Sequence, residues 1–165
     1  MPRVDKTKKL RPSVLDRLFD NEPHNQTERD LDDHQLLKKL RSSIRRDLES
    51  LLNTRFHISE PGDEFPQLEK SLLNYGLPDL ATVNIIDIDK RNEFTRALEK
   101  TLKYFEPRFK SVKVSFLERN DHTDRTLRFR IDAVIYADPL PEIVVFDSIF
   151  ESVTRTVNVK EISHG

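Results

Sequence analysis

The hydrophobic repeat of this chain changes its period at Pro107. Upstream, apolar residues such as Leu98 and Leu102 recur every three or four positions, which is the spacing of one face of an α-helix. Downstream, Val112 and Val114 alternate with polar residues, which is the two-residue period of a half-buried strand. The last helix has to end before Pro107, because proline disfavours a helical conformation at the residue before it. This order predicts an α+β fold, in which N-terminal helices pack on a C-terminal antiparallel β-meander of three to four strands.

The longest helix is expected over roughly residues 30 to 53, where leucines and Ile44 form a stripe between charged residues. Thr27 and Asp30 precede this stripe at the spacing of a capping box, with Asp in place of the usual Glu. Residues 27–165 are therefore expected to form a single domain.

Two further helices are expected before the change of period. The first is short, has Pro66 in its first turn and ends at Gly76, since glycine tolerates a left-handed conformation. The second begins after Asp87 or Asp89, either of which would cap it.

Residues 1–26 are expected to form a flexible basic head, a short docking helix and a linker. The head is the stretch "KTKKLR". The docking helix has an apolar face made of Val14, Leu15, Leu18 and Phe19. A helix this short is unstable alone, so it should clamp onto this domain or onto a partner.

Four strands are expected after Pro107, over residues 111–116, 127–136, 142–150 and 154–160. The third is apolar at both parities, which is typical of a central strand covered on two faces. The fourth would lie at the edge of the sheet, where another chain can pair with its open backbone groups. Its Lys160 is equally an ordinary protection against aggregation.

Composition excludes several classes of function. Lys plus Arg (28) balance Asp plus Glu (29), so no overall field favours nucleic acid or anionic lipid. The chain has no Cys, and no apolar run of signal-peptide or membrane-spanning length is recognised, which predicts a cytoplasmic protein without disulfides or membrane insertion. Three glycines are too few for a P-loop or a dinucleotide fingerprint, so no cofactor is expected.

Metal and nucleophile patterns are also missing. The five histidines have no partner at metal-ligand spacing, so no metal site is expected. Ser42 and Ser43 have no triad pattern nearby. The arginines of "DRTLRFRID" alternate with Asp124 and Asp132, which favours a solvated sheet face over a phosphate site.

Glu106 is the first candidate for acid or base catalysis, because a carboxylate at a helix C-terminus faces an unfavourable dipole. Cleavage of a sugar polymer would need a second carboxylate, such as Asp132, Glu142 or Asp147. The chain has no Trp and three Tyr, so it lacks an obvious stacking platform for sugars. A peptidoglycan-cleaving muramidase with Glu106 as its acid is the alternative reading of the chain.

The triplet Glu106, Pro107 and Arg108 also permits a second interpretation. In an extended segment residues two apart point the same way, so Glu106 and Arg108 should project together. An unbroken alternation puts Arg108 on the side of Val112, and a bulge at Phe109 would reverse this. The pair is then either an internal ion pair or a partly desolvated anchor for another protein.

Several stretches together resemble the TssE family, the baseplate subunits of bacterial type VI secretion systems, which are related to the lysozyme-like baseplate wedge proteins of contractile phages. The stretches, in order, are "PSVLDRLFD", "SIRRDLESLLNTR", "NYGLPDL", "YFEPRF" and "RFRIDAVIYADPLPEIVVFDSIF". The resemblance covers roughly residues 11–160, and "NYGLPDL" and the Glu-Pro-Arg triplet are its specific parts.

The resemblance implies a structural interaction protein that is not an enzyme. In the family the triplet is implicated in holding the subunit in the wedge, which would make Glu106, Pro107 and Arg108 the partner-binding residues. The implied partners are the wedge proteins TssF and TssG and the sheath proteins TssB and TssC. The implied location is the cytoplasm, at the baseplate docked on the inner-membrane complex, where the C-terminal sheet would be a template for the first sheath ring.

Overall fold

The computed structural model describes residues 14–18, 24, 32–55, 67–68, 71–78, 88–117, 126–137, 141–151 and 154–162. Several sequence predictions fall outside these residues: the basic head, Phe19, the Thr27 and Asp30 capping box, Pro66, Asp87, Asp124 and Arg125.

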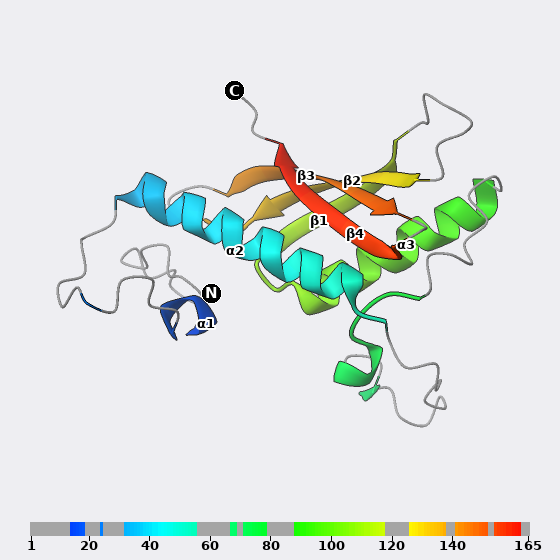
Figure 1. Cartoon of the computed structure of the whole chain (residues 1–165), viewed down its shortest axis with the longest axis horizontal. Coiled ribbons are helices and arrows are strands. Elements are labelled where there is room, and N and C mark those ends of the chain that lie inside the picture. Colours follow the sequence, from blue (N-terminus) through cyan, green and yellow to red (C-terminus); the bar gives the residue numbers. More distant parts are fainter. Residues whose placement is uncertain are drawn as a thin grey trace, which may run out of the picture.

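Helices precede strands along the chain, as predicted (Figure 1). The helices are α1 (Val14–Leu18), α2 (Asp33–Asn53), the 3-10 helix η2 (Leu72–Asn74) and α3 (Ile88–Phe105). The strands are β1 (Phe109–Phe116), β2 (Thr126–Ile135), β3 (Glu142–Glu151) and β4 (Thr156–Ile162). They form one sheet of order β1-β2-β3-β4, and each neighbouring pair is antiparallel. The α+β meander is therefore confirmed, and β4 is an edge strand.

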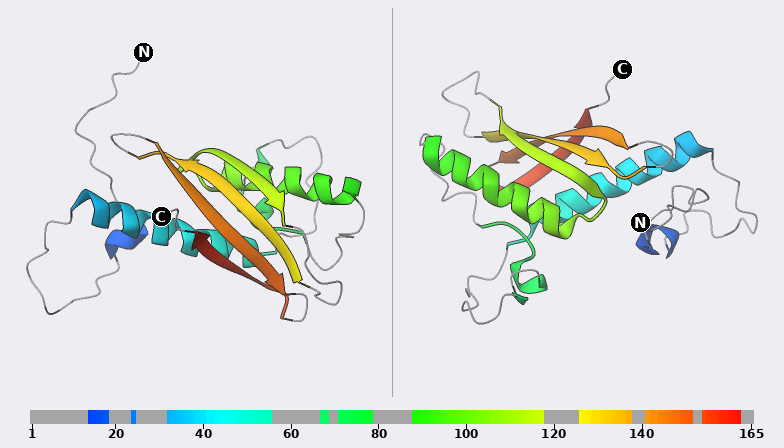
Figure 2. Two further views of the ribbon diagram at one scale, coloured as in Figure 1. Left: turned by 90° about the horizontal axis from the view of Figure 1, so that it is seen from above. Right: turned by 180° about the vertical axis from the view of Figure 1, so that it is seen from behind.

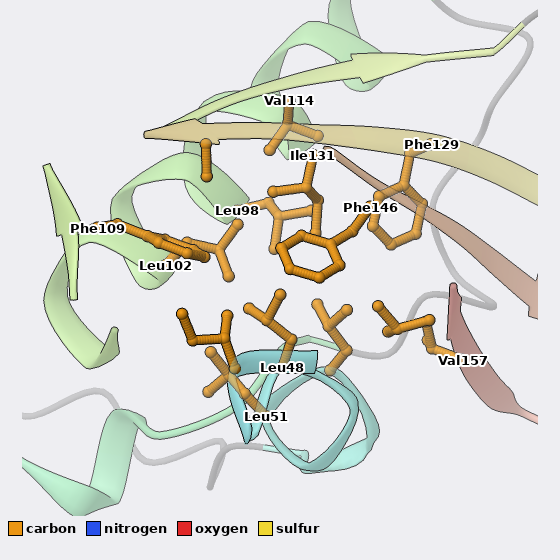
Figure 3. Packing of buried hydrophobic residues seen from close by; sticks show 14 of the residues in the cluster. Leu48, Leu51, Leu98, Leu102, Phe109, Val114, Phe129, Ile131, Phe146 and Val157 are labelled. Atoms are coloured by element: carbon orange, nitrogen blue, oxygen red, sulfur yellow. The ribbon is translucent and has the colours of Figure 1, made fainter. Parts of the chain in front are cut away.

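α2 and α3 lie on the same face of the sheet (Figures 1 and 2). The core fills the space between them and the strands, where Leu48 of α2 and Leu98 of α3 meet Phe129, Ile131 and Phe146 of the sheet (Figure 3). All five side chains are almost fully buried. Burial of a large apolar side chain contributes about 1.5–3 kcal/mol, so this layer holds the helices on the sheet.

The other face of β3 corrects one prediction. β3 is a central strand, as expected, but the described helices cover only one face of the sheet. Ile143 on the second face is 66% exposed, whereas Val145 on that face is 4% exposed. β3 is therefore apolar on both faces, but its second face is covered along only part of its length.

The start of α2 lies slightly later than predicted. Asp32 is its N-cap, and the Asp32 carboxylate accepts a hydrogen bond from the backbone N–H of Asp33 at 2.9 Å. Of the two residues predicted to cap α3, Asp87 lies outside the described residues, and Asp89 is not the cap, because it lies inside the first turn of that helix. A carboxylate there still interacts favourably with the helix dipole.

The segment before α3 is a 3-10 helix rather than the longer helix expected. Gly76 follows it with φ of 119°, so the predicted stop at a residue that tolerates positive φ is confirmed. Leu77 is buried, and its N–H donates to the backbone oxygen of Thr54 at 2.9 Å. The rings of Tyr75 and Phe105 meet edge to face with centroids 5.2 Å apart. These contacts fix the C-terminal ends of α2 and α3 relative to each other.

Candidate partner-binding site

A tight turn joins α3 to β1 and contains the Glu-Pro-Arg triplet. The N–H of Glu106 still donates to the oxygen of Leu102 at 2.9 Å, so the triplet begins on the last turn of the helix. The N–H of Phe109 then donates to the Glu106 oxygen at 3.1 Å. Pro107 is exposed between them and cannot continue the helical ladder, because it has no N–H. The turn thus holds Glu106 and Arg108 on either side of an exposed proline.

Glu106 and Arg108 pair within the chain. Glu106 Oε1 accepts from Arg108 Nε at 2.6 Å and from the Arg108 backbone N–H at 3.2 Å. Glu106 Oε2 accepts from Arg108 Nη2 at 2.5 Å. The carboxylate and guanidinium therefore meet through two parallel hydrogen bonds, which is the strongest geometry for this pair. The two side chains project together, as predicted, but from a tight turn and not from the extended segment on which the prediction rested. Glu106 and Arg108 therefore form an ion pair within the chain.

The alternation of side chains along β1 is interrupted at Phe109. This is the bulge that, in the sequence analysis, would reverse the side on which Arg108 lies. The register with β2 shifts between Phe109 and Ser111, and Phe109 is buried in the core. Val114, on the core side beyond the shift, is buried as well. The irregularity allows Arg108 to turn away from the apolar core toward α2.

α2 supplies two more partners to the guanidinium. Arg108 Nη1 donates to Ser43 Oγ at 3.1 Å, and Arg108 Nη2 donates to Asp47 Oδ2 at 2.6 Å. Ser43 and Asp47 are four positions apart, so they lie above one another on the same face of the helix. The turn between α3 and β1 is therefore tied to the middle of α2.

The contacts continue to α1 through the residue Asp16. Ser43 Oγ donates to Asp16 Oδ2 at 2.6 Å, and Arg46 Nη2 donates to Asp16 Oδ1 at 2.7 Å. Arg46 Nη2 also lies 3.4 Å from Asp47 Oδ1. We call the connected residues the Arg108 network: Asp16, Ser43, Arg46, Asp47, Glu106 and Arg108. The short helix thus contacts the domain as expected, but through polar groups, since Val14, Leu15 and Leu18 are exposed.

Ionisation of the network follows from these contacts. Burial lowers the pKa of Arg108, but the hydrogen bonds and charges of Glu106 and Asp47 outweigh it, and the net shift is upward. The hydrogen bond with Asp16 is the largest influence on Arg46, and its pKa is also raised. Both arginines are therefore charged at every working pH.

The network reaches the surface on one side. The side chain of Glu106 is 5% exposed, and that of Arg108 is 23% exposed. Tyr136 is 60% exposed, and its N–H donates to the Arg108 backbone oxygen at 2.9 Å. Pro107, Arg108 and Tyr136 therefore form one patch, with a buried carboxylate beneath it.

The remaining carboxylates nominated for catalysis have other surroundings. Asp147 accepts from Arg130 Nε at 2.9 Å on the face of the sheet without described helices. Asp132 lies on that same face by the alternation of β2. Glu142 forms an ion pair with Arg41 of α2. The arginines of β2 thus follow the interpretation of a solvated face, and Arg130 is paired there.

The described part of the chain has neither a cluster of metal ligands nor a membrane-spanning helix. No group of three or more His, Asp or Glu side chains there could hold a metal ion. None of the helices described is long and apolar enough to span a membrane.

Sequence reasoning found the triplet but missed its partners from elsewhere in the chain. The sequence pattern gives Ser43 no role beyond the lack of a catalytic triad, and it does not single out Asp16, Asp47 or Tyr136. One signal was available: Ser43 and Asp47 each come directly before a residue of the apolar stripe of α2, Ile44 and Leu48. Small and acidic residues in such positions indicate a polar contact at the border of the core.

Comparison with known families gives the chain its class. The model of a family described as "Baseplate wedge protein gp25" matches residues 38–140, which is more than half of the chain and includes the triplet. The matched range contains most of α2, all of α3, β1 and β2, and it ends before β3. No curated protein matches the chain. The chain belongs to the baseplate wedge protein gp25 family, whose members are structural components of baseplates.

Proposed function

We propose that this protein is the TssE-type baseplate subunit of a type VI secretion system, which links the wedge to the contractile sheath and helps to start sheath polymerisation. The observation that carries the proposal is the family match over residues 38–140. Within this family, the wider resemblance of the sequence, over roughly residues 11–160, supports an assignment of the chain to the TssE group. In this proposal residues 27–165 act as a single domain, and residues 1–26 as an appended head and linker.

The proposed wedge contact is the patch of Pro107, Arg108 and Tyr136, with TssF and TssG as the partners. Tyrosine and arginine are enriched among the residues that dominate the binding energy of interfaces. The hydrogen bonds of Arg108 to Glu106 and Asp47 support this role, because they fix the guanidinium before a partner arrives. The sheath proteins TssB and TssC are the proposed partners of the sheet.

We further propose that the protein is not an enzyme. A general acid has to give a proton to its substrate, and both oxygens of Glu106 accept hydrogen bonds from Arg108. The muramidase alternative predicts clearing of peptidoglycan in a zymogram and its loss in Glu106→Gln. We expect no clearing by either protein.

The experiment that tests the class is a pull-down of the tagged full chain from cells that assemble the secretion system, followed by mass spectrometry. Recovery of TssF and TssG together with TssB and TssC is the expected result. Recovery of phage tail proteins in their place would move the chain to a phage baseplate, and recovery of neither set would overturn the proposal. The proposed site of action is the cytoplasmic side of the inner-membrane complex.

A further inference from the structure

The outer side of α3 carries a line of cationic side chains along its C-terminal half. α3 packs along β1 (Figures 1 and 2), and Arg96, Lys100 and Lys103 are exposed on its other side. Their spacing of four and three residues places them on one face of the helix, opposite to the core. We call these three residues the basic ridge. Its line continues to the exposed Pro107, four positions beyond Lys103, so the ridge adjoins the patch proposed as the wedge contact.

The carboxylates of the same segment are turned away from the basic ridge. Glu99 reaches β1, where its Oε1 accepts from a backbone N–H in the middle of the strand at 2.8 Å. Glu106 is buried in its ion pair. In the described part of the chain neither Arg96 nor Lys103 forms an ion pair. Positive charge is therefore exposed along the ridge without an equal exposure of negative charge.

The stability of the helix does not account for the basic ridge. Cations near a helix C-terminus interact favourably with the helix dipole, but this effect falls off within the last turn. Lys103 lies in that turn, whereas Arg96 and Lys100 lie before it. The N-terminal half of α3 carries mixed charges instead, and Lys90 pairs there with Glu93 at 3.3 Å. The excess of positive charge is thus concentrated at the end of α3 that leads into the turn.

An aromatic ring lies beside the basic ridge. Tyr104 is 40% exposed, and Lys100 Nζ lies 5.8 Å from the centre of its ring. This cation–π contact favours one position of the flexible lysine side chain. Tyrosine is also enriched among the residues that dominate the binding energy of interfaces. A partner on this side of α3 therefore meets an exposed ring together with a positioned cation.

We infer that the basic ridge and Tyr104 bind an acidic segment of another protein, whose carboxylates pair with Arg96, Lys100 and Lys103. Neighbours on the ridge are about 5–6 Å apart, so an acidic helix lying along α3 would present its carboxylates at the same spacing. The contact would lengthen the proposed wedge surface by about 10 Å. The naming of TssF or TssG as the source of the acidic segment rests on the proposed function.

Nucleic acid does not suit the same charge. Its non-specific binding depends on the neutralisation of many phosphates, whereas the basic ridge offers the cations of two helical turns. The chain as a whole has a formal net charge of -1, so no wider field supports such binding. Carboxylates of a protein can pair with the three cations one by one, which is why we assign the ridge to an acidic protein.

Lys103→Glu tests the basic ridge, and Lys160→Glu is its matched control. Both variants replace an exposed lysine by glutamate, but Lys160 lies on β4, at the opposite edge of the sheet from α3. At an ionic strength of about 0.1 M, we expect Lys103→Glu to bind the purified complex of TssF and TssG about tenfold more weakly than wild type. Lys160→Glu should bind as wild type does. Surface plasmon resonance with the full chain measures these affinities.

Salt dependence separates a loss of charge pairing from a loss of structure. The Debye length falls from about 10 Å at 0.1 M to about 3 Å at 1 M. The difference in affinity between wild type and Lys103→Glu should therefore shrink to less than about threefold at the higher salt, whereas a damaged fold would keep it. Arg96→Glu is the second ridge variant, because it lies before the last turn and adds no unfavourable charge at the helix C-terminus. It should show the same loss and the same salt dependence.

A zero-length cross-linker shows what the basic ridge touches in the unmodified chain. A carbodiimide joins a lysine amine to a carboxylate by an amide bond where the two are in contact. In the complex of the full chain with TssF and TssG, we expect Lys103 to be joined to an Asp or Glu of one of them, and Lys160 to neither. Replacement of that carboxylate by lysine should weaken the binding of wild type and restore the binding of Lys103→Glu.

The outcomes separate the inference from the proposed function. A wild-type chain that binds neither TssF nor TssG overturns the proposed function. If wild type binds, equal affinities of Lys103→Glu, Arg96→Glu and Lys160→Glu at low salt overturn only the basic ridge. A cross-link from Lys103 to a second copy of this chain, or a mobility shift of a DNA duplex by wild type that Lys103→Glu lacks, overturns the choice of an acidic wedge segment as the partner.

Discussion

Arg108 Nη2 lies 2.6 Å from Asp47 Oδ2, although the two residues are 61 positions apart in the sequence. This bond ties the turn between α3 and β1 to the middle of α2. Arg108 therefore supports the fold at the same place where we propose that it meets the wedge. A loss of binding in a variant of Arg108 has to be separated from a loss of stability.

Replacement of Arg108 by alanine leaves the buried Glu106 carboxylate without its partner. Removal of one member of a buried ion pair typically costs about 3–5 kcal/mol, so we expect the free energy of unfolding to fall by this order. Urea denaturation of the isolated chain measures it. The control is the double variant Glu106→Leu with Arg108→Met, which removes both charges and should recover most of the lost stability. Equal unfolding midpoints for Arg108→Ala and wild type would show that the pair does not support the fold.

The helices and strands follow from local patterns, which is why the sequence predicts them. The apolar stripe of α2 and the apolar–polar alternation of β2 each depend on residues that are close in the sequence, and α3 ends at Phe105, just before Pro107. The segment before Gly76 is predicted as a longer helix because its apolar residues have helical spacing, but in the structure it is the 3-10 helix η2. There the segment instead turns to pack Leu77 beside the end of α2, a contact between distant segments.

The same substitution should have opposite effects at two buried serines. Ser148 is fully buried in β3, and its Oγ has no hydrogen-bond partner among the residues that the structure describes, so Ser148→Ala removes an unsatisfied polar group. We expect it to raise the free energy of unfolding by about 1 kcal/mol. Ser43→Ala should lower it by about 1–2 kcal/mol, because Ser43 Oγ bonds to both Arg108 and Asp16. Thermal and urea unfolding of the two single variants measure both changes in the free energy of unfolding. Destabilisation by Ser148→Ala would contradict the assignment of Ser148 Oγ as an unsatisfied polar group.

The partners of the triplet could not be predicted from the sequence, for a physical reason. Which residue of α2 meets Arg108 depends on how α2 packs on the sheet, and nothing within a few positions of Asp47 or Ser43 determines that packing. The same holds for Asn53, which reads as an ordinary polar residue at a helix end until Val157 is placed beside it. Local pattern reveals a charged pair next to a proline, and only the tertiary structure shows what the pair is joined to.

Arg155 occupies a conformation that favours glycine. Its φ is 55° in the turn between β3 and β4, where its N–H donates to the Glu151 oxygen at 2.8 Å. A residue with a side chain costs about 1 kcal/mol or more in this region. We expect Arg155→Gly to keep or raise the melting temperature and Arg155→Val to lower it, because a β-branched side chain crowds the backbone further. Differential scanning calorimetry compares the three proteins, and a valine variant as stable as glycine would contradict the strain.

Tyr136 offers the cleanest test of the proposed wedge surface, because its side chain is largely exposed and its structural contact to Arg108 is made by the backbone. Tyr136→Ala should therefore leave the melting temperature nearly unchanged. Truncation of a tyrosine that anchors an interface commonly costs about 2 kcal/mol or more, which is roughly a thirtyfold loss of affinity. Co-purification of TssF and TssG with the tagged variant measures the effect.

The matched control for Tyr136→Ala is Ile88→Ala, because Ile88 is exposed to a similar extent but begins α3, at the opposite end of the helix from the triplet. At about 1.5 Å per residue, the helix places Ile88 more than 20 Å from the turn, beyond direct contact with a partner bound at Arg108. Ile88→Ala should recover TssF and TssG as wild type does. Loss of recovery in both variants would indicate a surface that extends along α3, and full recovery in Tyr136→Ala would exclude the patch as the wedge contact.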